Sequence, residues 1–438
     1  MSVARLRLLQ PLQEASYEVV QSALVIGGGL AGITAALSIA EQGFPVVLIE
    51  RTAELGGNAR TLYYTEDGAN PAQYLQELIA KVESNSLITV YKETELLSIT
   101  GSCGSYTTTL AVQGETRDID HGVVFVATGG EEYKPTEYLY GEHPQIMTQK
   151  EFEVLLATKP DEVKGLQKVV MIQCVGSREP EHLYCSRVCC TAAIKNSLKL
   201  KSINPDTQIS ILYRDIRTFG LKESYYTKAR KQGVRFFRFE REQKPEVALQ
   251  GDTLGILVFD QQLQAVVALE ADLLILSAAI RPREESKQLA EVTRLPLEED
   301  GFFMEAHIKL RPLDFATEGF YLCGLAHGPK FANESIAQAR GAVSRALTVL
   351  SKKIIETEGE ISHVNELLCR GCGKCEDACP FNAISVVERE DGKQVARVKE
   401  VLCKGCGQCA VVCPSGAASI FHFKDPEILS MVAAALDI

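Results

Sequence analysis

The stretch SALVIGGGLAGITAALSIAEQGFPVVLIER, residues 22–51, limits the possible folds of this chain more than any other segment. A short apolar run leads into three glycines in G-x-G-x-x-G spacing, a helix-forming run of small residues follows, and a second apolar run, PVVLIE, comes after it. Gly27 permits a tight turn, Gly29 allows a close backbone approach, and Gly32 lets the helix pack against the strand. The segment therefore predicts a strand, a helix and a second, parallel strand.

The same segment predicts a dinucleotide site. Free N–H groups at the start of the helix are suited to hold a pyrophosphate. Glu50 lies at the end of the second strand, where a carboxylate can accept hydrogen bonds from a ribose diol. The full context of strand, turn, helix, strand and acid favours dinucleotide binding over a structural glycine turn. We expect the contacts at Gly27, Gly29, Gly32, Glu50 and Arg51.

Two later apolar runs also end in glycine. VVFVATGG at 123–130 breaks at Thr128 and Gly129, and GFYLCGLAH at 319–327 repeats the pattern at Gly324. Together with the first motif, this combination resembles the flavoprotein family with two dinucleotide sites that includes thioredoxin reductase. The resemblance implies an FAD-binding first half that is interrupted by a second Rossmann unit.

The resemblance also implies further FAD contacts and shows one departure. Gly57, in the glycine pair after Glu50, indicates a second close backbone approach, and Thr128, Gly129 and Gly324 complete the expected set. In the family an acid usually follows the last glycine and contacts the ribityl chain of the flavin. Here Leu325 follows that glycine, so this contact is not carried over, whereas FAD binding is.

A cysteine-rich loop stands where the second unit should carry its own glycine loop. The run KVVMIQCVGS starts as a strand, but no glycine fingerprint follows; a plausible helix, TAAIKNSLKLK, and a further strand, QISILYRD, come after the loop. The second unit is therefore not expected to bind a nicotinamide nucleotide. Four thiolates suit a [4Fe–4S] cluster, while zinc and a dithiol redox site are the alternatives. The four residues are Cys174, Cys185, Cys189 and Cys190.

The residues around these cysteines extend the resemblance to nearly the whole chain. CVGSR, YCSRVCC and the following AIK are similar to the cysteine signature of the A-type subunits of heterodisulfide reductase, as are RDIRTFG, LSAAIRP, HIKLRPLDFATEGFYLCGLAHGPKF and ESIAQARGA. The resemblance to this family implies that the four cysteines hold a [4Fe–4S] cluster close to the FAD. It also implies a catalytic Lys195 near the flavin ring, the alternative being a solvated helix residue. Methanogen members are longer, with an extra N-terminal region and an inserted ferredoxin segment.

The C-terminal part of the chain carries the most specific motif. CRGCGKCEDACP at 369–380 and CKGCGQCAVVCP at 403–414 are two copies of C-x-x-C-x-x-C-x-x-x-C-P. In bacterial two-cluster ferredoxins the first three cysteines of each copy bind one [4Fe–4S] cluster and the fourth ligates the other. We expect one cluster at Cys369, Cys372, Cys375 and Cys413, and the other at Cys403, Cys406, Cys409 and Cys379. The preceding SKKIIETEGEISHVNEL is expected to form a helix and a connector.

Length and composition set the outer limits. A chain of 438 residues predicts about three domains, and a net charge of −11 argues against nucleic acid or an anionic membrane as the main partner. The sequence has neither a secretory signal nor an apolar run of membrane-spanning length, so we expect a cytoplasmic protein. In that compartment its fourteen cysteines are expected to serve metal or redox chemistry rather than disulfides.

The expected architecture is α/β, with two Rossmann-like units of the thioredoxin reductase type and an α+β ferredoxin domain. The FAD-binding domain is expected over residues 1–140 and 300–352, the second Rossmann-like domain over 141–299, and the ferredoxin domain over 353–438. Some residues outside the motifs also have a prediction. Cys103 and Cys323 are expected to be small buried hydrophobes, RDIR at 214–217 a structural or partner-contacting segment, and His307 and His327 histidines without a functional role.

The predicted cofactors, FAD and three [4Fe–4S] clusters, indicate an oxidoreductase, because flavins exchange one or two electrons and clusters exchange one. The family resemblance implies an electron-transfer subunit of a larger complex that bifurcates electrons. Its expected partners are ferredoxin, thiol/disulfide-type subunits and a hydrogenase-, formate- or NADH-linked electron-input subunit. The alternatives are a non-bifurcating relay in a quinone-linked or sulfur-metabolising complex, and a docking or scaffold subunit.

Overall fold

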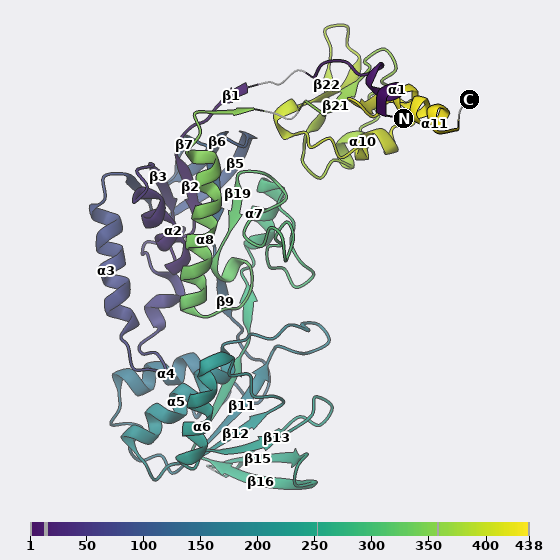
Figure 1. The fold of residues 1–438 in the computed structure, drawn as a ribbon. Coiled ribbons are helices and arrows are strands. Elements are labelled where there is room, and N and C mark those ends of the chain that lie inside the picture. The colour runs from purple at the N-terminus through teal and green to yellow at the C-terminus, as the bar shows by residue number, and fades with distance from the viewer. Residues whose placement is uncertain (1, 13–15, 252, 357–358, 437–438) are drawn as a thin grey trace.

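The computed structural model describes residues 2–12, 16–251, 253–356 and 359–436. Two units of sheet and helix lie one above the other, and a smaller domain extends from the end of the first unit (Figure 1). Within these ranges no helix is both long enough and apolar enough to cross a membrane.

The first unit is built on a five-stranded parallel sheet in the order β19-β8-β2-β3-β4. All residues of the adjacent strands β2 and β8 are buried, as expected for parallel strands that are covered on both faces. The outer strand β19 comes from much later in the chain, so this unit is discontinuous in sequence. The strands are β2 (Ala23–Ile26), β3 (Val46–Ile49), β4 (Ile88–Tyr91), β8 (Val123–Val126) and β19 (Phe320–Leu322).

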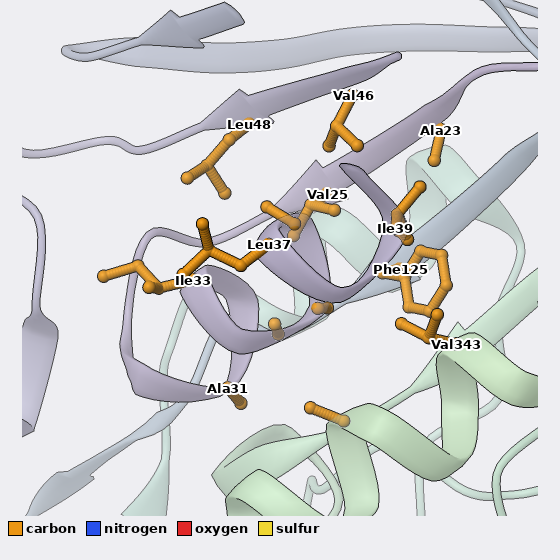
Figure 2. Close-up of a cluster of buried hydrophobic side chains, with 14 of the residues drawn as sticks. Ala23, Val25, Ala31, Ile33, Leu37, Ile39, Val46, Leu48, Phe125 and Val343 are labelled. Carbon is orange, nitrogen blue, oxygen red and sulfur yellow. The ribbon is translucent and has the colours of Figure 1, made fainter. Parts of the chain in front are cut away.

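Different layers cover the two faces of this sheet. On one face, α2 packs against the sheet and against α8, where Ile39 and Val343 approach the ring of Phe125 (Figure 2). On the other face an antiparallel sheet and α7 complete a second core. The helices are α2 (Leu30–Ala40), α3 (Pro71–Ser84), α7 (Ser286–Thr293) and α8 (Ala332–Leu350), and the antiparallel strands are β5 (Thr94–Ser102), β6 (Ser105–Val112) and β7 (Glu115–His121).

The second unit repeats the arrangement with a parallel sheet in the order β10-β17-β11-β12-β13. Three helices pack on one face, and an antiparallel sheet covers the other. The parallel strands are β10 (Ile146–Thr148), β11 (Lys168–Val175), β12 (Gln208–Tyr213), β13 (Arg235–Arg238) and β17 (Leu273–Ala278). The helices are α4 (Gln149–Thr158), α5 (Cys189–Ile203) and α6 (Glu223–Lys231), and the antiparallel strands are β14 (Glu246–Gln250), β15 (Thr253–Asp260) and β16 (Ala265–Ala271).

Two short strands join the units. The chain leaves the first unit through β9 (Gly130–Glu132) and returns through β18 (Ile280–Pro282), and these strands pair antiparallel. The Glu132 carboxylate accepts a hydrogen bond from the Thr148 hydroxyl, which also caps α4. The joint is therefore an ordered two-stranded ribbon that fixes where the loops of the second unit meet the first.

The C-terminal domain contains two small antiparallel sheets and short helices. Strand β21 pairs with β24, and β22 pairs with β23. A small apolar core, which includes several of the motif cysteines, lies between them. The elements are β21 (Ser362–Val364), α9 (Lys374–Asp377), β22 (Ile384–Glu388), β23 (Gln394–Val398), α10 (Gln408–Val412), β24 (Ala418–Ile420) and α11 (Asp425–Leu436).

The N-terminal segment belongs spatially to this C-terminal domain. Helix α1 (Ser2–Leu6) lies beside α11, where the Arg5 guanidinium donates to the His422 carbonyl and stacks 4.9 Å from the centre of the Phe423 ring. Next, β1 (Ser16–Glu18) pairs antiparallel with β20 (Ile354–Glu356), so two strands connect the domain to the first unit (Figure 1). Helix α1, in the segment expected to open the FAD-binding domain over residues 1–140, thus lies beside the C-terminal domain.

The expected helix over SKKIIETEGEISHVNEL is wrong. The described part of this segment holds β20 and β21, whereas the residues 357–358 lie outside the described ranges. Strand β20 contains two β-branched residues, and each strand finds a partner far away in sequence, β1 for β20 and β24 for β21. Pairing with distant strands therefore decides a conformation that the local charge pattern did not reveal.

Candidate functional site

A cavity of about 360 Å³ opens in the first unit where β2, β3, β8 and β19 end. Ligands of open α/β sheets bind at this edge, outside the carboxyl ends of the strands. Nearly all the predicted cofactor residues line the cavity, although they come from distant parts of the chain. They are Gly27, Gly29, Glu50, Arg51, Gly57, Thr128, Gly129 and Gly324.

The glycine loop divides into packing and binding positions. Gly32 lies below the cavity, and a Cβ atom there would stand 1.8 Å from the Gly27 carbonyl oxygen, so only glycine lets α2 pack this closely. Gly29 caps α2 without a side-chain hydrogen bond, and a Cβ atom there would meet nothing within 4 Å. Free backbone N–H groups beside open space form a cradle that fits a pyrophosphate.

The acid after β3 is held beside this loop. Glu50 Oε2 accepts a hydrogen bond from the Gly28 N–H at 2.8 Å, and Oε1 accepts from the Thr52 N–H at 2.9 Å. Its neighbour Arg51 forms an ion pair with Glu285 at the rim of the cavity. The carboxylate is thus positioned by the backbone, as a ribose-binding acid requires.

Two buried polar atoms at the cavity lack partners among the described residues. These are the Thr128 hydroxyl oxygen and Arg283 Nε, and both residues line the cavity. Burial, and then the neighbouring charge of Arg51, lower the pKa of Arg283. Unpaired buried polar groups are costly, so their presence is consistent with a polar ligand in this space. Sequence analysis missed Arg283, which follows the LSAAIRP stretch without any motif of its own.

A polar network supports the last glycine motif. The Lys330 ammonium donates to the Gly324 carbonyl at 2.6 Å, and burial lowers its pKa to about 8. His327 bonds Glu305 at 2.9 Å and Gln338 at 2.7 Å, while Gln338 accepts from the Gly324 N–H. Lys330 lines the cavity and was also missed by sequence analysis. The sequence did not indicate the partners of His327, which lie up to 22 residues away along the chain.

The four cysteines of the second unit come together between β11 and α5. Cys174 lies near the end of β11 with φ +64°, and Cys189 and Cys190 form the first turn of α5. Burial raises the pKa of Cys189 well above its usual value, and charges on Cys190, Cys174 and Cys185 add to the rise. The helix start carries no side-chain cap, so its N–H groups remain free for an anionic group. These thiols are suited to hold a cluster that keeps them deprotonated.

The loop that carries Cys185 docks on the joining strand β18 and on the first unit. The Tyr184 hydroxyl donates to the Ile280 carbonyl at 2.8 Å, and the Ile280 N–H donates to the Ser186 hydroxyl at 3.0 Å. Arg187 forms an ion pair with Glu334 in the first turn of α8, next to the cavity-lining residue Ser335. The cysteine loop is therefore fixed against the wall of the cavity.

Lys195 lies in a different place from the other predicted site residues. It is 8% exposed, so the alternative of a solvated helix residue is wrong. Its ammonium group donates to Glu153 Oε2 at 2.6 Å and to the Tyr64 carbonyl at 3.0 Å. Burial lowers its pKa, and Glu153 opposes this shift. Lys195 does not line the described cavity, but it fixes the segment that follows the cavity-lining residue Leu62.

The motif cysteines of the C-terminal domain line two small hollows. Each hollow collects three cysteines of one motif and the fourth cysteine of the other, which is the exchange expected from their spacing. The first is lined by Cys369, Cys372, Cys375 and Cys413, and the second by Cys403, Cys406, Cys409 and Cys379. Within the described ranges, no group of three or more His, Cys, Asp or Glu side chains is arranged for a single metal ion.

The backbone around these hollows is shaped to meet sulfur. N–H groups of Ala396 and Ala383 donate to the sulfurs of Cys369 and Cys379 at 3.3 and 3.2 Å. Burial of Cys413 is outweighed by surrounding hydrogen bonds, beginning with the Ala418 N–H, which lower its pKa to about 7. Such bonds stabilise thiolates and tune clusters, so the donor set fits iron–sulfur ligation.

The remaining isolated residues occupy structural positions. Cys103 and Cys323 are 6% and 0% exposed, and both are therefore small buried residues as predicted. His307 is exposed and accepts hydrogen bonds from the N–H groups of its own turn.

Comparison with known proteins agrees with this division of the chain. Residues 21–172 match a family model described as pyridine nucleotide-disulphide oxidoreductase, and residues 368–417 match one described as a 4Fe-4S dicluster domain. Among solved structures, thioredoxin reductase of T. acidophilum has a TM-score of 0.50 at 17% identity, covering 76% of this chain and 98% of that one. The Lactococcus lactis enzyme has a TM-score of 0.51 at 14% identity, covering 75% and 99%. These structures share the fold, which confirms the predicted thioredoxin-reductase-type α/β class with an added 4Fe-4S domain.

Curated relatives extend the similarity to most of the chain. The second A-type iron–sulfur subunit of CoB–CoM heterodisulfide reductase from Methanopyrus kandleri is 33% identical, over 90% of this chain and 74% of that protein. The A-type subunit of the H2:CoB–CoM heterodisulfide,ferredoxin reductase from Methanothermobacter marburgensis is 32% identical, over 100% and 79%. The cavity fits a dinucleotide, and the chain is an FAD- and iron–sulfur-dependent oxidoreductase. It belongs to the family of A-type subunits of heterodisulfide reductase.

Proposed function

We propose that this chain is the electron-dividing subunit of a heterodisulfide-reductase-like complex, with FAD in the 360 Å³ cavity and three [4Fe–4S] clusters. One cluster is assigned to the quartet of Cys174, Cys185, Cys189 and Cys190, and two to the C-terminal hollows. Bound flavin exchanges one or two electrons and bound clusters exchange one, so this set converts between the two kinds of transfer. The partners are a two-electron donor subunit, ferredoxin and a disulfide-reducing subunit.

The observation that carries the proposal is the place of the quartet. Its loop replaces the phosphate-binding turn of the second Rossmann unit, contacts the joining strand β18 through Tyr184, and contacts the first unit through Arg187. A nicotinamide nucleotide would need glycines at this turn to bring the backbone close. The chain instead presents four thiols there, beside the wall of the flavin cavity. A carrier at the quartet would therefore be adjacent to the flavin.

The electrons balance over two cycles. In each cycle the chain takes two electrons from the donor and passes one to ferredoxin and one to the disulfide-reducing partner. Two cycles then reduce two ferredoxin equivalents and, with two protons, one disulfide to two thiols. The name of the Methanothermobacter marburgensis relative, H2:CoB–CoM heterodisulfide,ferredoxin reductase, gives both acceptor classes after its donor and supports them.

The first test is composition. Anaerobically purified protein should contain one FAD and about twelve iron and twelve acid-labile sulfide per chain, since each [4Fe–4S] cluster has four of each. About eight iron per chain, together with four thiols that react with iodoacetamide, would show that the quartet holds no cluster. Zinc found in place of the missing iron would identify the alternative metal.

The second test distinguishes electron division between two acceptors from a simple electron relay. The chain is purified with its neighbouring subunits, which mass spectrometry identifies, and reduced with their donor. If the chain divides electrons between two acceptors, ferredoxin becomes reduced only while the disulfide acceptor is present. Reduced ferredoxin and thiol then appear in a fixed ratio. Ferredoxin reduction at an equal rate without the disulfide would favour the relay. Assembly of the complex with full activity from chains that lack FAD would favour a scaffold role.

A further inference from the structure

The RDIR segment, residues 214–217, lies against the cysteine quartet. It begins directly after β12, where NADPH enzymes of this fold carry arginines for the 2′-phosphate. Here the Cys190 thiol donates to the Asp215 carbonyl oxygen with the sulfur 3.6 Å away. Burial raises the pKa of Cys190 to about 12, and a backbone N–H of Arg217 acts against the rise. A segment that is a nucleotide contact in other proteins therefore forms part of the cysteine environment.

Arg178 is held between this segment and the quartet. Its Nη1 lies 4.0 Å from Cys174 Sγ, and its Nη2 donates to Asp215 Oδ2 at 2.8 Å. Its backbone carbonyl accepts a hydrogen bond from Arg214 at 2.7 Å, and its own φ is +59°. An arginine in the left-handed region is uncommon and has to be stabilised by its surroundings. The contacts at both ends of Arg178 supply that stabilisation and aim its guanidinium at the sulfur.

The charge around the quartet is set by a small ionic group. Arg178, Arg214 and Arg217 contribute positive charge, and Asp215 and Glu179 partly neutralise it. Arg214 is 7% exposed, so solvent screens its charge little. The Arg178 guanidinium is the member of this group whose contact with a quartet sulfur is direct, since its Nη1 lies 4.0 Å from Cys174 Sγ.

We propose that Arg178, positioned by Asp215 and Arg214, raises the reduction potential of the iron–sulfur cluster assigned to the quartet. Reduction adds one electron, and hence one negative charge, to a thiolate-ligated cluster. A fixed cation near the sulfurs stabilises this added charge, and hydrogen bonds to sulfur act in the same sense. Arg178 is a positioning residue, because it acts through the cluster environment. The inference rests on the proposed function, since it requires a cluster at the quartet.

The test compares three full-length variants by redox titration followed with EPR. Arg178→Gln removes the cation, Arg178→Lys keeps it, and Arg241→Gln is the matched control. Arg241 also belongs to the second unit, but its side chain pairs with its neighbour Glu242 and is 46% exposed. The relevant EPR signal is identified as the one missing from a Cys189→Ser variant. Iron content is measured for every protein, so that altered potential is separated from lost cluster.

Arg178→Gln should shift the ratio of reduced to oxidised cluster at least tenfold toward the oxidised form, which is a lowering of about 59 mV for a one-electron couple. Arg178→Lys should shift the ratio less, and Arg241→Gln should shift the logarithm of the ratio by less than half as much as Arg178→Gln does. An unchanged potential in Arg178→Gln with full iron overturns the inference, as does an equal shift in the Arg241 control. If Arg178→Gln loses the cluster, Arg178→Lys must load it and titrate within tenfold of the parent. Loss of iron in both variants would assign Arg178 a structural role.

Failure of the proposed function has a different signature. If the parent protein contains about eight iron and shows no EPR signal that depends on Cys189, the quartet holds no cluster. Parent protein with about twelve iron and a Cys189-dependent signal leaves the cluster in place. The Arg178 variants then test the inference alone.

Discussion

The two Rossmann units of this protein share a scaffold and differ at the turn after the first strand. In the first unit, residues 27–29 connect β2 directly to α2, and glycine backbone forms the turn. In the second unit, residues 176–188 connect β11 to α5, and cysteines lie at both ends of this longer loop. A glycine turn presents N–H groups to phosphate, whereas the longer loop presents thiols. In this protein the shared scaffold therefore fixes the position of each site, and the residues of the turn determine its chemistry.

The residues after the second strand differ in the same way. In the first unit Glu50 follows β3 and is held by backbone N–H groups beside the glycine turn. In the second unit Arg214 and Asp215 follow β12 and hold Arg178 beside Cys174. Both positions support the turn in front of them, one through a carboxylate for a ribose and the other through an ionic group around sulfur.

The largest effect is expected at the glycine turn, where two substitutions separate packing from binding. Gly32→Ala places a Cβ atom against the Gly27 carbonyl, so it should destabilise the first unit by roughly 3 kcal/mol or more and abolish FAD binding. Gly29→Ala meets open space and should leave the melting temperature of the apoprotein unchanged. It should nevertheless weaken FAD binding at least tenfold, about 1.4 kcal/mol, by filling the phosphate cradle. Thermal melts and flavin fluorescence titration measure the two effects, and a parental FAD affinity in Gly29→Ala would contradict the assigned cradle.

The next effect concerns the thiol turn of the second unit. Cys189→Ser should lower iron from about twelve to about eight per chain, because one cluster needs four ligands. FAD and both C-terminal clusters should remain, since their residues lie in separate parts of the structure. Electron flow from reduced flavin to the C-terminal clusters should slow sharply in stopped-flow absorbance. Cys323→Ser, at a buried cysteine of the first unit, is the matched control for losing a thiol. A Cys189→Ser protein with all its iron and the parental rate would show that the quartet is not a relay.

A smaller effect is expected at the joint that holds the two turns together. Burial raises the pKa of Glu132 to about 7 from its usual 4.5, and Lys150 opposes the rise. Below about pH 4.5 both folded and unfolded chains are protonated at this residue, and its contribution to stability is complete. Between pH 4.5 and 7 the unfolded chain alone loses the proton, so stability falls as pH rises.

Glu132→Gln should therefore stabilise the protein by about 2 kcal/mol at pH 8, allowing for partial solvent screening, and the gain should vanish near pH 4.5. Denaturant unfolding of anaerobic protein at both pH values measures the difference. Glu142→Gln changes an exposed carboxyl in the following segment and should not reproduce it. A gain that is independent of pH would assign the effect to packing.

The smallest expected effect is that of NADH and NADPH on the flavin, which we expect them not to reduce. Because the second unit has cysteines in place of a phosphate-binding glycine loop, NADH and NADPH should not reduce the flavin of the isolated chain. Anaerobic mixing followed by flavin absorbance checks this, with dithionite as the positive control. Rapid bleaching of the flavin by either nucleotide would show that the isolated chain does accept a nicotinamide nucleotide, and the expected difference between the two units would be wrong.

The parts of the fold and of the candidate sites that could be predicted from the sequence are those determined by local motifs. Gly27 to Glu50 form one continuous strand–helix–strand segment, and the paired cysteine motifs carry their exchange of ligands in their spacing. Both are determined by neighbours in sequence, and the structure brings together the residues that they predicted.

The residues and strands that the sequence did not indicate depend on contacts between distant parts of the chain. Arg178 meets Asp215 across 37 positions, Gln338 meets Gly324 across 14, and β20 meets β1 at the other end of the chain. Arg283 and Lys330 carry no motif and acquire their meaning only when the cavity forms around them. The prediction for 351–367 failed for the same reason, since strand pairing with distant segments overrides local propensity.

The contact between α1 and α11 bears on how the protein is made. The ribosome releases α1 before α11, and at about 5–20 residues per second the roughly 420 residues between them take about 20 to 80 s to synthesise. During this time Val3 and Leu6, which remain 65% and 66% exposed even in the finished fold, have no neighbouring helix. The C-terminal domain is therefore completed by a segment that is made well before it, and nascent chains should engage chaperones through α1 until α11 emerges.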